Sequence, residues 1–480
     1  MELLIIFSSL FVASFIALIS KRRALIEAVS IIASLIVFSA STIIASKVVS
    51  AGEYLPNVYF SVDSLGALLL LIISCVGLAV TVYSIAYLRK ESAKGIVGLT
   101  RIRQYFALLN LFVAVMVLAV SSSSPILAWI SIEATTLSTA FLISFYNKPS
   151  AMEAAWKYLI INSIGLLLAF FGTLLYFTSL QTVGETGFTT WGNLLSNATY
   201  LDPAVAKIVF IFVLIGYGTK VGLVPMHTWL PDAHSKAPAP ISALLSGVLL
   251  NVAFIIVLRF KAITDLAIGP DFSQKLLIIF GLFSVLVAAL IIFTQKNYKR
   301  LLAYSSIENM GITALGFGFG GVGIFAAVLH LIYHSLVKSA LFLTAGNIFL
   351  KYGSTKIAKI RGAIGVIPVT AILFLVGFFA ITGAPPFGIF LTKLLIFSAG
   401  ITLHPVITIL MILLTALVFV GFFRHAQAMV FGKAEGEIKK ESESFWLILP
   451  PLSLLVLAFY FSVYQPPFLQ ILIDNVISHY

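Results

Sequence analysis

Residues 209–229, VFIFVLIGYGTKVGLVPMHTW, decide the class of fold, because they form a long apolar run that contains one lysine, Lys220. A helix of about 20 apolar residues crosses a hydrocarbon core of about 30 Å. Similar runs recur along all 480 residues, of which 60% are hydrophobic and 10% charged, whereas about a quarter of a soluble chain is charged. The runs are continuously apolar, unlike the alternating strands of a membrane β-barrel. The sequence therefore predicts an all-α polytopic membrane protein.

Fourteen membrane spans are predicted at a length of about 20 residues each. They begin near Glu2, Ala24, Asp63, Gln104, Pro125, Ala155, Ala204, Pro240, Ser273, Leu301, Val322, Ile367, Pro405 and Trp446. The first span is expected to be a retained helix. A cleavable signal peptide has its basic residues before the apolar stretch, whereas here Lys21, Arg22 and Arg23 follow it.

Basic residues mark one side of the membrane. Loops after the odd-numbered spans carry 22 Lys and Arg, among them Lys433, Lys439 and Lys440, and loops after the even-numbered spans carry five. By the positive-inside rule the odd-numbered loops are cytoplasmic, and both termini then lie outside. The net charge of +12 is therefore interpreted as an orientation signal rather than as a surface that binds nucleic acid.

The sequence lacks the signatures of several kinds of chemistry. Its single cysteine, Cys75, excludes an intrachain disulfide and a cysteine-ligated cluster. No phosphate-binding loop of the GxxxxGK[ST] type occurs. We therefore expect no cofactor, no metal site and no catalytic residue in this chain, and we expect its energy to come from an ion gradient or from partner subunits.

Ionisable residues inside the predicted spans indicate an ion path. A lysine at mid-membrane costs about 2.5–3.5 kcal/mol, and such residues usually face the protein interior or a water-filled cavity. Glu133 is interpreted as the only acid well inside a span, so we predict that it pairs with Lys220. A static interhelical ion pair is the alternative, which is disfavoured because a buried pair rarely offsets its own desolvation.

Three further titratable residues, His330, His334 and Lys338, follow i, i+4, i+8 spacing. This spacing places them near one face of a helix. Because histidine changes charge near neutral pH, such a row can pass protons through intervening waters. The alternative is that the histidines only form hydrogen bonds between helices, but three titratable groups in one stripe favour the relay.

Two predicted spans are interrupted next to a lysine. Gly and Pro residues at 383–388 precede Lys393, and those at 216–225 surround Lys220. Broken helices at matching places in two halves of a chain are typical of inverted-repeat transporters, in which the binding site lies at the break. Ordinary proline kinks are the alternative, and the buried lysine beside each break favours the transporter interpretation.

The segment that follows the seventh span is too polar to face lipid. It contains His227, Asp232 and His234, which we interpret as candidates for proton uptake or gating at the cytoplasmic mouth. A helix-capping turn in which Asp232 bonds free backbone N–H groups is an equally weighted alternative. Glu308, near the cytoplasmic start of the tenth span, is a weaker candidate of the same kind.

Four stretches of sequence resemble signatures of one family. They are GTKVGLVPMHTWLPDAHSKAPAPISALLSGVLL (218–250), QKNYKRLLAYSSIENMG (295–311), HSLVKSALFLTAGN (334–347) and TGAPPFGIFLTK (382–393). Together they resemble the antiporter-like, proton-translocating membrane subunits of complex I and the membrane-bound hydrogenases. The similarity covers roughly residues 60–430, and SGVLLN with SSIENMGI is most similar to the F-type subunit of hydrogenase-4.

The resemblance implies a division of the chain into four parts. Residues 1–103 would form an N-terminal three-helix segment and residues 445–480 the last helix with a short tail. Residues 104–260 and 273–431 would form two inverted five-helix repeats that contain broken helices.

The resemblance also assigns roles to the buried ionisable residues. Glu133 and Lys220 would be the paired glutamate and lysine of the fifth and seventh spans, Lys338 the central lysine, and Lys393 the terminal one. The chain departs from many relatives in having Ser246 and Asn251 where they have a lysine or histidine in the eighth span.

The predicted function is translocation of protons, or of sodium and protons, by a non-catalytic subunit of a multisubunit redox-driven complex. Such complexes include membrane-bound hydrogenase, formate hydrogenlyase-like, sulfane reductase and NADH dehydrogenase assemblies, in the plasma membrane of a prokaryote. Its partners would be the other membrane subunits. A non-conducting subunit that anchors the redox module is the main alternative, and a stand-alone transporter of a small organic solute ranks last.

Overall fold

The computed structural model describes residues 1–181, 189–432 and 442–477 of the chain. Lys433, Lys439 and Lys440, which were counted on the basic side of the membrane, lie outside these residues. The described elements are α1 (Glu2–Ile19), α2 (Arg23–Ala51), β1 (Tyr54–Asn57), β2 (Phe60–Val62), α3 (Ser64–Ala93), α4 (Leu99–Ser121), α5 (Pro125–Ile143), α6 (Pro149–Gln181), α7 (Trp191–Ser196), η1 (Ala198–Tyr200), α8 (Pro203–Val221), η2 (Met226–Thr228), α9 (Trp229–Lys236), α10 (Ala239–Leu244), η3 (Leu245–Leu249), α11 (Leu250–Ile268), α12 (Asp271–Ile292), α13 (Tyr298–Phe319), α14 (Val322–Tyr352), η4 (Ile357–Lys359), α15 (Ala363–Val366), α16 (Pro368–Thr382), α17 (Gly388–Leu403), α18 (Pro405–Phe431), α19 (Phe445–Val463) and α20 (Pro467–Ile477).

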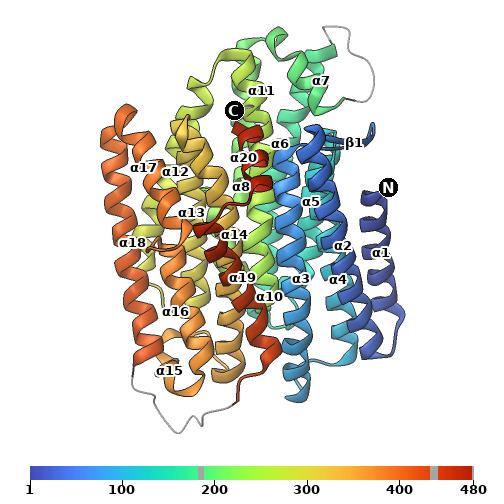
Figure 1. Cartoon of the computed structure of the whole chain (residues 1–480), viewed down its shortest axis with the longest axis vertical. Helices are drawn as coiled ribbons and strands as arrows, with labels where there is room; N and C mark the ends of the chain where they lie inside the picture. Colours follow the sequence, from blue (N-terminus) through green and yellow to red (C-terminus); the bar gives the residue numbers. More distant parts are fainter. Residues whose placement is uncertain (182–188, 433–441, 478–480) are drawn as a thin grey trace.

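The long helices run side by side along the vertical axis of Figure 1, from α1 at one edge to α18 at the other. Twelve helical segments in the described part of the chain are long and apolar enough to cross a membrane. The prediction of an all-α polytopic membrane protein is therefore confirmed. The total of fourteen spans and the two inverted repeats remain predictions.

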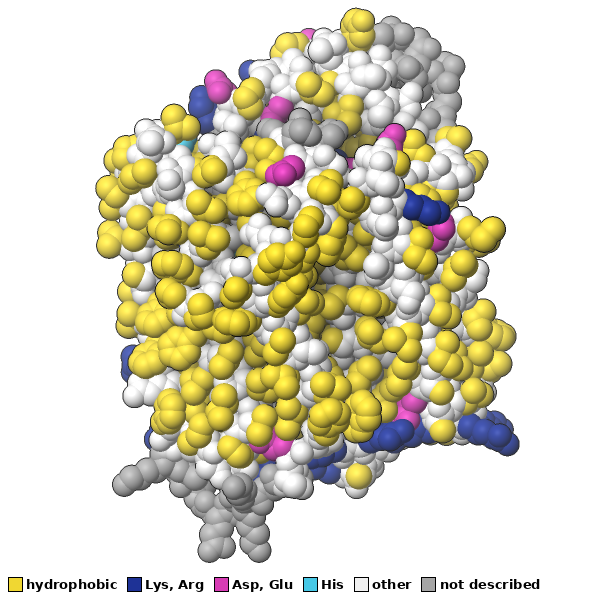
Figure 2. Space-filling model, viewed as in Figure 1, with side chains coloured by type: hydrophobic (Ala, Val, Ile, Leu, Met, Phe, Trp, Pro, Cys, Tyr) yellow, Lys and Arg dark blue, Asp and Glu magenta, His cyan; other side chains and the backbone are white. Residues whose placement is uncertain are grey.

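The two ends of the bundle differ in charge. The start of α1 and the C-terminal helix α20 lie toward the upper end in Figure 1. In Figure 2, most of the visible Lys and Arg side chains gather along the lower rim of the molecule, below a broad band of hydrophobic side chains. The start of α1 and helix α20 thus lie toward the end opposite the basic rim.

Both interruptions predicted from sequence are real breaks in helices. Helix α8 ends at Val221 and is followed by η2 and α9, while α16 ends at Thr382 and α17 begins at Gly388. Gly383 has φ +86°, a left-handed conformation that glycine adopts without the penalty a Cβ atom brings. The breaks therefore follow from local backbone chemistry rather than from proline kinks alone.

The centre of the bundle is formed by α10, η3, α11, α13 and α14, whose residues are almost all buried. The segment η3 is a π-helix between α10 and α11, a form that occurs mostly as short bulges and often at functional sites. Helices α6 and α8 pack so closely at Gly216 that a Cβ atom there would lie 2.6 Å from the carbonyl oxygen of Gly165. Only glycine, which has no Cβ atom, allows this approach. This close approach sets the position of Lys220, four residues further along α8.

Candidate functional site

Lys220 lies in the last turn of α8 and is fully buried. Its Nζ donates hydrogen bonds to Thr136 Oγ1 on α5, at 2.7 Å, and to the Tyr158 hydroxyl on α6, at 2.6 Å. The ammonium also lies 4.7 Å from the centroid of the Tyr158 ring, where the ring quadrupole attracts a cation. Three helices thus meet at this one ammonium group.

Glu133 and Lys220, which were predicted to pair, make no direct contact in this structure. Among the described residues, Lys220 Nζ has no carboxylate oxygen within 4.0 Å, whereas Glu133 Oε1 accepts a hydrogen bond from Ser163 on α6 at 2.9 Å. Hydroxyl groups of α5 and α6 replace the carboxylate as partners of the ammonium. Glu133 Oε2 is shielded and has no hydrogen-bond partner within the part of the chain that the structure describes.

Ser246 and Asn251 link the predicted eighth span to α13 and α14. Ser246 in η3 shares a hydrogen bond of 2.7 Å with Ser306 of α13. Asn251 Nδ2 donates to Ser335 Oγ of α14 at 2.6 Å. These polar groups cannot hold a proton as a charge, but the serine hydroxyls can pass one on, because each has a donor and an acceptor.

The row predicted from i, i+4, i+8 spacing lies on α14, and all three of its side chains are fully buried. Lys338 Nζ donates to the Leu302 carbonyl of α13 at 2.7 Å. Neither ring nitrogen of His334 has a hydrogen-bond partner among the described residues. The three side chains share a helix but do not bond directly to one another, so a proton passing along them would need intervening waters.

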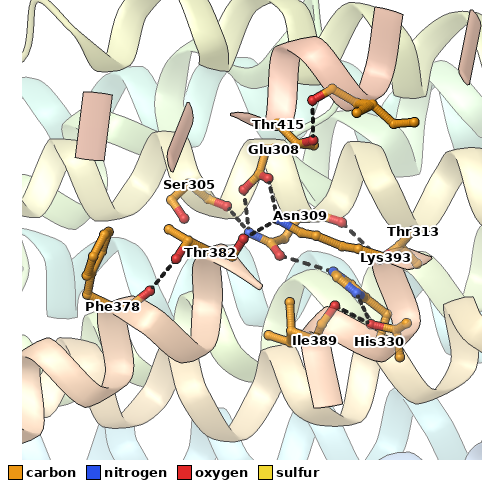
Figure 3. A network of polar contacts seen from close by, with 12 residues as sticks. Ser305, Glu308, Asn309, Thr313, His330, Phe378, Thr382, Ile389, Lys393 and Thr415 are labelled. Atoms are coloured by element: carbon orange, nitrogen blue, oxygen red, sulfur yellow. Dashed lines mark hydrogen bonds and ion pairs between the residues drawn. The ribbon is translucent and has the colours of Figure 1, made fainter. Parts of the chain in front are cut away.

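A buried ion pair joins α13 to α17. Lys393 Nζ lies 2.8 Å from Glu308 Oε1, and these side chains are 7% and 0% exposed. Lys393 also donates to the Thr382 carbonyl at 3.2 Å. Figure 3 shows the pair at the centre of a polar network between the helices. The interpretation of Glu133 as the only acid well inside a span is wrong, and Glu308, ranked as a weak candidate, is the acid that pairs with a buried lysine.

The network continues from this pair to His330. Asn309, next to Glu308, contacts both the Glu308 carboxylate and the His330 ring, as Figure 3 shows. On its other side the ring contacts Thr392 Oγ1 of α17 at 2.8 Å. One imidazole is therefore held between α13 and α17 at both of its nitrogens.

The segment after the break in α8 carries the candidates for proton uptake. Asp232 forms an ion pair with Arg300 of α13 and lies 3.7 Å from Lys157 Nζ of α6. Its side chain thus ties α9 to two other helices, and the capping turn considered as an alternative is wrong. His234 is fully buried and stacks on Phe342 with ring centroids 4.9 Å apart, and His227 lies near Tyr304.

Sequence reasoning missed the neutral partners of the buried charges. Thr136 lies three residues after Glu133, so spacing along a helix could have indicated it. Thr392 and Asn309 are adjacent in sequence to Lys393 and Glu308, a spacing that does not place two side chains on one helix face. Tyr158 carried no such signal, because only the tertiary packing of α6 brings its hydroxyl to Lys220.

The fold and the buried polar groups together define a polytopic helical membrane protein with ionisable groups along its interior. Residues 122–419 match the family model described as "NADH:quinone oxidoreductase/Mrp antiporter, TM". Residues 49–95 match the model described as "NADH-Ubiquinone oxidoreductase (complex I), chain 5 N-terminus". The chain belongs to the NADH:quinone oxidoreductase/Mrp antiporter family.

Individual relatives refine this assignment. The chain is 40% identical over 424 residues to a hydrogenase-4 component F homolog of Methylacidiphilum infernorum (isolate V4), covering 86% of this chain and 87% of that one. It spans about half the length of other curated relatives, such as hydrogenase-4 component B of Escherichia coli (strain K12). The resemblance to the F-type subunit is confirmed.

Solved structures share the fold. A chain of the membrane-bound sulfane sulfur reductase, an archaeal respiratory membrane complex, superimposes with a TM-score of 0.87 at 24% identity, covering 100% of this chain and 96% of that one. A chain of the Mrp complex from Dietzia sp. DQ12-45-1b gives a TM-score of 0.85 at 19% identity, covering 99% and 96%. At these identities the likeness concerns the fold alone.

Proposed function

We propose that the chain is a proton-translocating subunit of a multisubunit, redox-driven membrane complex of the hydrogenase, formate hydrogenlyase, sulfane reductase or NADH dehydrogenase kind. One observation carries the proposal: three fully or almost fully buried lysines, Lys220, Lys338 and Lys393, each donate hydrogen bonds inside the bundle. Charged groups are rare in membrane interiors and mark ion paths.

The two lysines beside the helix breaks differ in their partners. Lys393 is paired with a carboxylate, whereas Lys220 is held by two hydroxyl groups. A neighbouring carboxylate favours a charged ammonium, and its withdrawal favours the neutral amine. Movement of Glu133 between Ser163 and Lys220 would therefore decide whether Lys220 keeps its proton, and the released proton would pass toward Lys338 and Lys393.

This path would run from the basic end of the bundle to the opposite end. The basic rim in Figure 2 would face the cytoplasm by the positive-inside rule, with both termini outside a prokaryotic plasma membrane. His227, Asp232 and His234 would then lie at the uptake side. Each proton moved against 100 mV costs about 2.3 kcal/mol, which the redox chemistry of partner subunits would supply.

The test is ion movement by the intact complex in sealed vesicles, with internal pH, internal sodium and redox turnover followed together. Lys220→Ala is compared with Lys261→Ala, a matched control that also removes a buried ammonium group. Lys261 lies outside the proposed path, and its Nζ is 2.5 Å from Asp265 Oδ2.

We expect proton movement per turnover to fall in Lys220→Ala and to persist in Lys261→Ala, with both complexes assembled. If sodium movement stops instead, sodium is the transported ion. If Lys220→Ala moves ions as the wild type does, the chain is a non-conducting anchor of the redox module.

A further inference from the structure

The side-chain amide of Asn309 has only one chemically reasonable orientation. Its nitrogen lies 2.7 Å from the Ser305 carbonyl oxygen and 2.7 Å from Glu308 Oε2. A backbone carbonyl oxygen can only accept a hydrogen bond, and the Glu308 oxygen belongs to a carboxylate in an ion pair, so both neighbours call for N–H groups. The amide oxygen is therefore the atom that faces His330 Nε2, at 3.0 Å.

This orientation fixes the tautomer of His330. An amide oxygen can only accept a hydrogen bond, so His330 Nε2 must carry a proton whether the ring is neutral or charged. Only Nδ1 can gain or lose a proton while these contacts persist. Nδ1 faces Thr392 Oγ1 at 2.8 Å.

The Thr392 hydroxyl suits both charge states of the ring. It also lies 3.1 Å from the Ile389 carbonyl oxygen of its own helix. When Nδ1 is bare, the hydroxyl can donate to it, and when Nδ1 is protonated, the hydroxyl can accept from it and donate to Ile389. These contacts can therefore accommodate either charge state of His330 through rotation of one O–H bond, without movement of a heavy atom, while the proton itself must reach or leave Nδ1 through a group or water beyond them.

Asn309 also separates the imidazole from the nearest carboxylate. Glu308 Oε1 is engaged by Lys393 and Oε2 by the Asn309 amide. A carboxamide holds its N–H protons under ordinary conditions and does not pass them on as a hydroxyl, carboxyl or water does. The shortest connection between His330 and Glu308, visible in Figure 3, is thus closed to protons.

We propose that Asn309 is a positioning residue that fixes His330 as its Nε2–H tautomer and insulates it from Glu308, so that protons pass only on the Thr392 side of the ring. The proposal rests on the function proposed above and adds the atom at which His330 exchanges its proton. Asn309 touches no transported ion in this role, and His330 exchanges its proton at Nδ1, the atom that Thr392 faces.

Two matched pairs of variants in the intact complex test this inference. Thr392→Val removes the hydroxyl at nearly constant shape, and Thr392→Ser keeps it. We expect proton movement per turnover to fall by about tenfold or more in Thr392→Val, as expected for loss of a hydrogen bond to a charged group, and to remain near wild type in Thr392→Ser. Assembly is checked by immunodetection of the partner subunits.

The second pair tests the insulation. Asn309→Asp puts a group that can transfer protons between His330 and Glu308, whereas Asn309→Leu places an apolar group there. We expect vesicles with Asn309→Asp to dissipate an imposed pH gradient faster than wild type without redox turnover, and vesicles with Asn309→Leu to hold the gradient. A packing role for Asn309 would not produce this difference.

The possible results separate this inference from the proposed function. If Lys220→Ala stops proton movement but Thr392→Val pumps normally, or Asn309→Asp leaks no faster than Asn309→Leu, the insulation idea is overturned and the proposed function stands. If Lys220→Ala pumps normally, the proposed function fails first, and the leak difference between the two Asn309 variants still decides whether that residue insulates.

Discussion

The buried pair of Glu308 and Lys393 allows a quantitative prediction. The atoms Oε1 and Nζ are 2.8 Å apart, and the side chains are 0% and 7% exposed. Removal of one partner from a buried pair costs about 3–5 kcal/mol, because it leaves the other charge uncompensated, whereas replacement of both by uncharged groups is often nearly neutral. Glu308→Gln and Lys393→Met should therefore each destabilise the chain by that amount.

The double variant carries the sharper expectation, because it should be more stable than either single variant. In a double-mutant cycle this corresponds to a coupling free energy of at least about 3 kcal/mol. Pulse proteolysis of the purified complex over a denaturant series, with immunodetection of this chain, measures the folded fraction of each variant.

The pair of Asp232 and Arg300 supplies the control cycle. Its side chains are 25% and 36% exposed, so water screens the charges and the expected coupling is about 0–1 kcal/mol. If the losses from Glu308→Gln and Lys393→Met simply add in the double variant, the two charges do not stabilise each other and the ion-pair argument is refuted.

Three further outcomes follow from the packing and the hydrogen bonds. Tyr158→Phe removes a hydroxyl that binds Lys220 and should lower proton movement per turnover, whereas Tyr176→Phe, whose hydroxyl donates to a carbonyl elsewhere, should not; vesicle pH assays compare the two. Ser246→Ala removes the hydroxyl that bonds to α13 and should slow proton movement in the same assay at unchanged redox turnover. Gly388→Ala would place a Cβ atom 2.3 Å from a tyrosine ring, while Gly365→Ala meets nothing within 4 Å; the first should cost about 1–3 kcal/mol and the second almost nothing, as pulse proteolysis would report.

The sequence was sufficient for the fold because the bilayer imposes strong local rules. Long apolar runs predict spans, and the glycine and proline clusters at 216–225 and 383–388 predict breaks in helices without knowledge of tertiary contacts. The starts predicted for all fourteen spans fall within six residues of a helix start in the structure.

The candidate site could be predicted only in part, because its pairings depend on helix packing. Lys220 and Lys393 stand out in apolar runs, but the neighbouring helices determine whether each ammonium group meets hydroxyl groups or a carboxylate. Glu308 was placed near the start of its span, yet it lies three turns into α13 and faces α17. Glu133 was placed correctly in its helix and assigned the wrong contact.

The two helix breaks both place a buried lysine next to the end of a half-helix, one before the break and one after it. Lys220 precedes its break and lies in the last turn of α8, whereas Lys393 follows its break and reaches back to the carbonyl of Thr382, the last residue of α16. Lys220 thus belongs to the last turn of one half-helix, and the Lys393 ammonium contacts the last carbonyl group of another, where unpaired carbonyl groups carry partial negative charge. A continuous helix would use those carbonyl groups in its own hydrogen bonds. The breaks therefore help to hold a buried cation even when its carboxylate partner withdraws, and a relay in which carboxylates come and go requires such support.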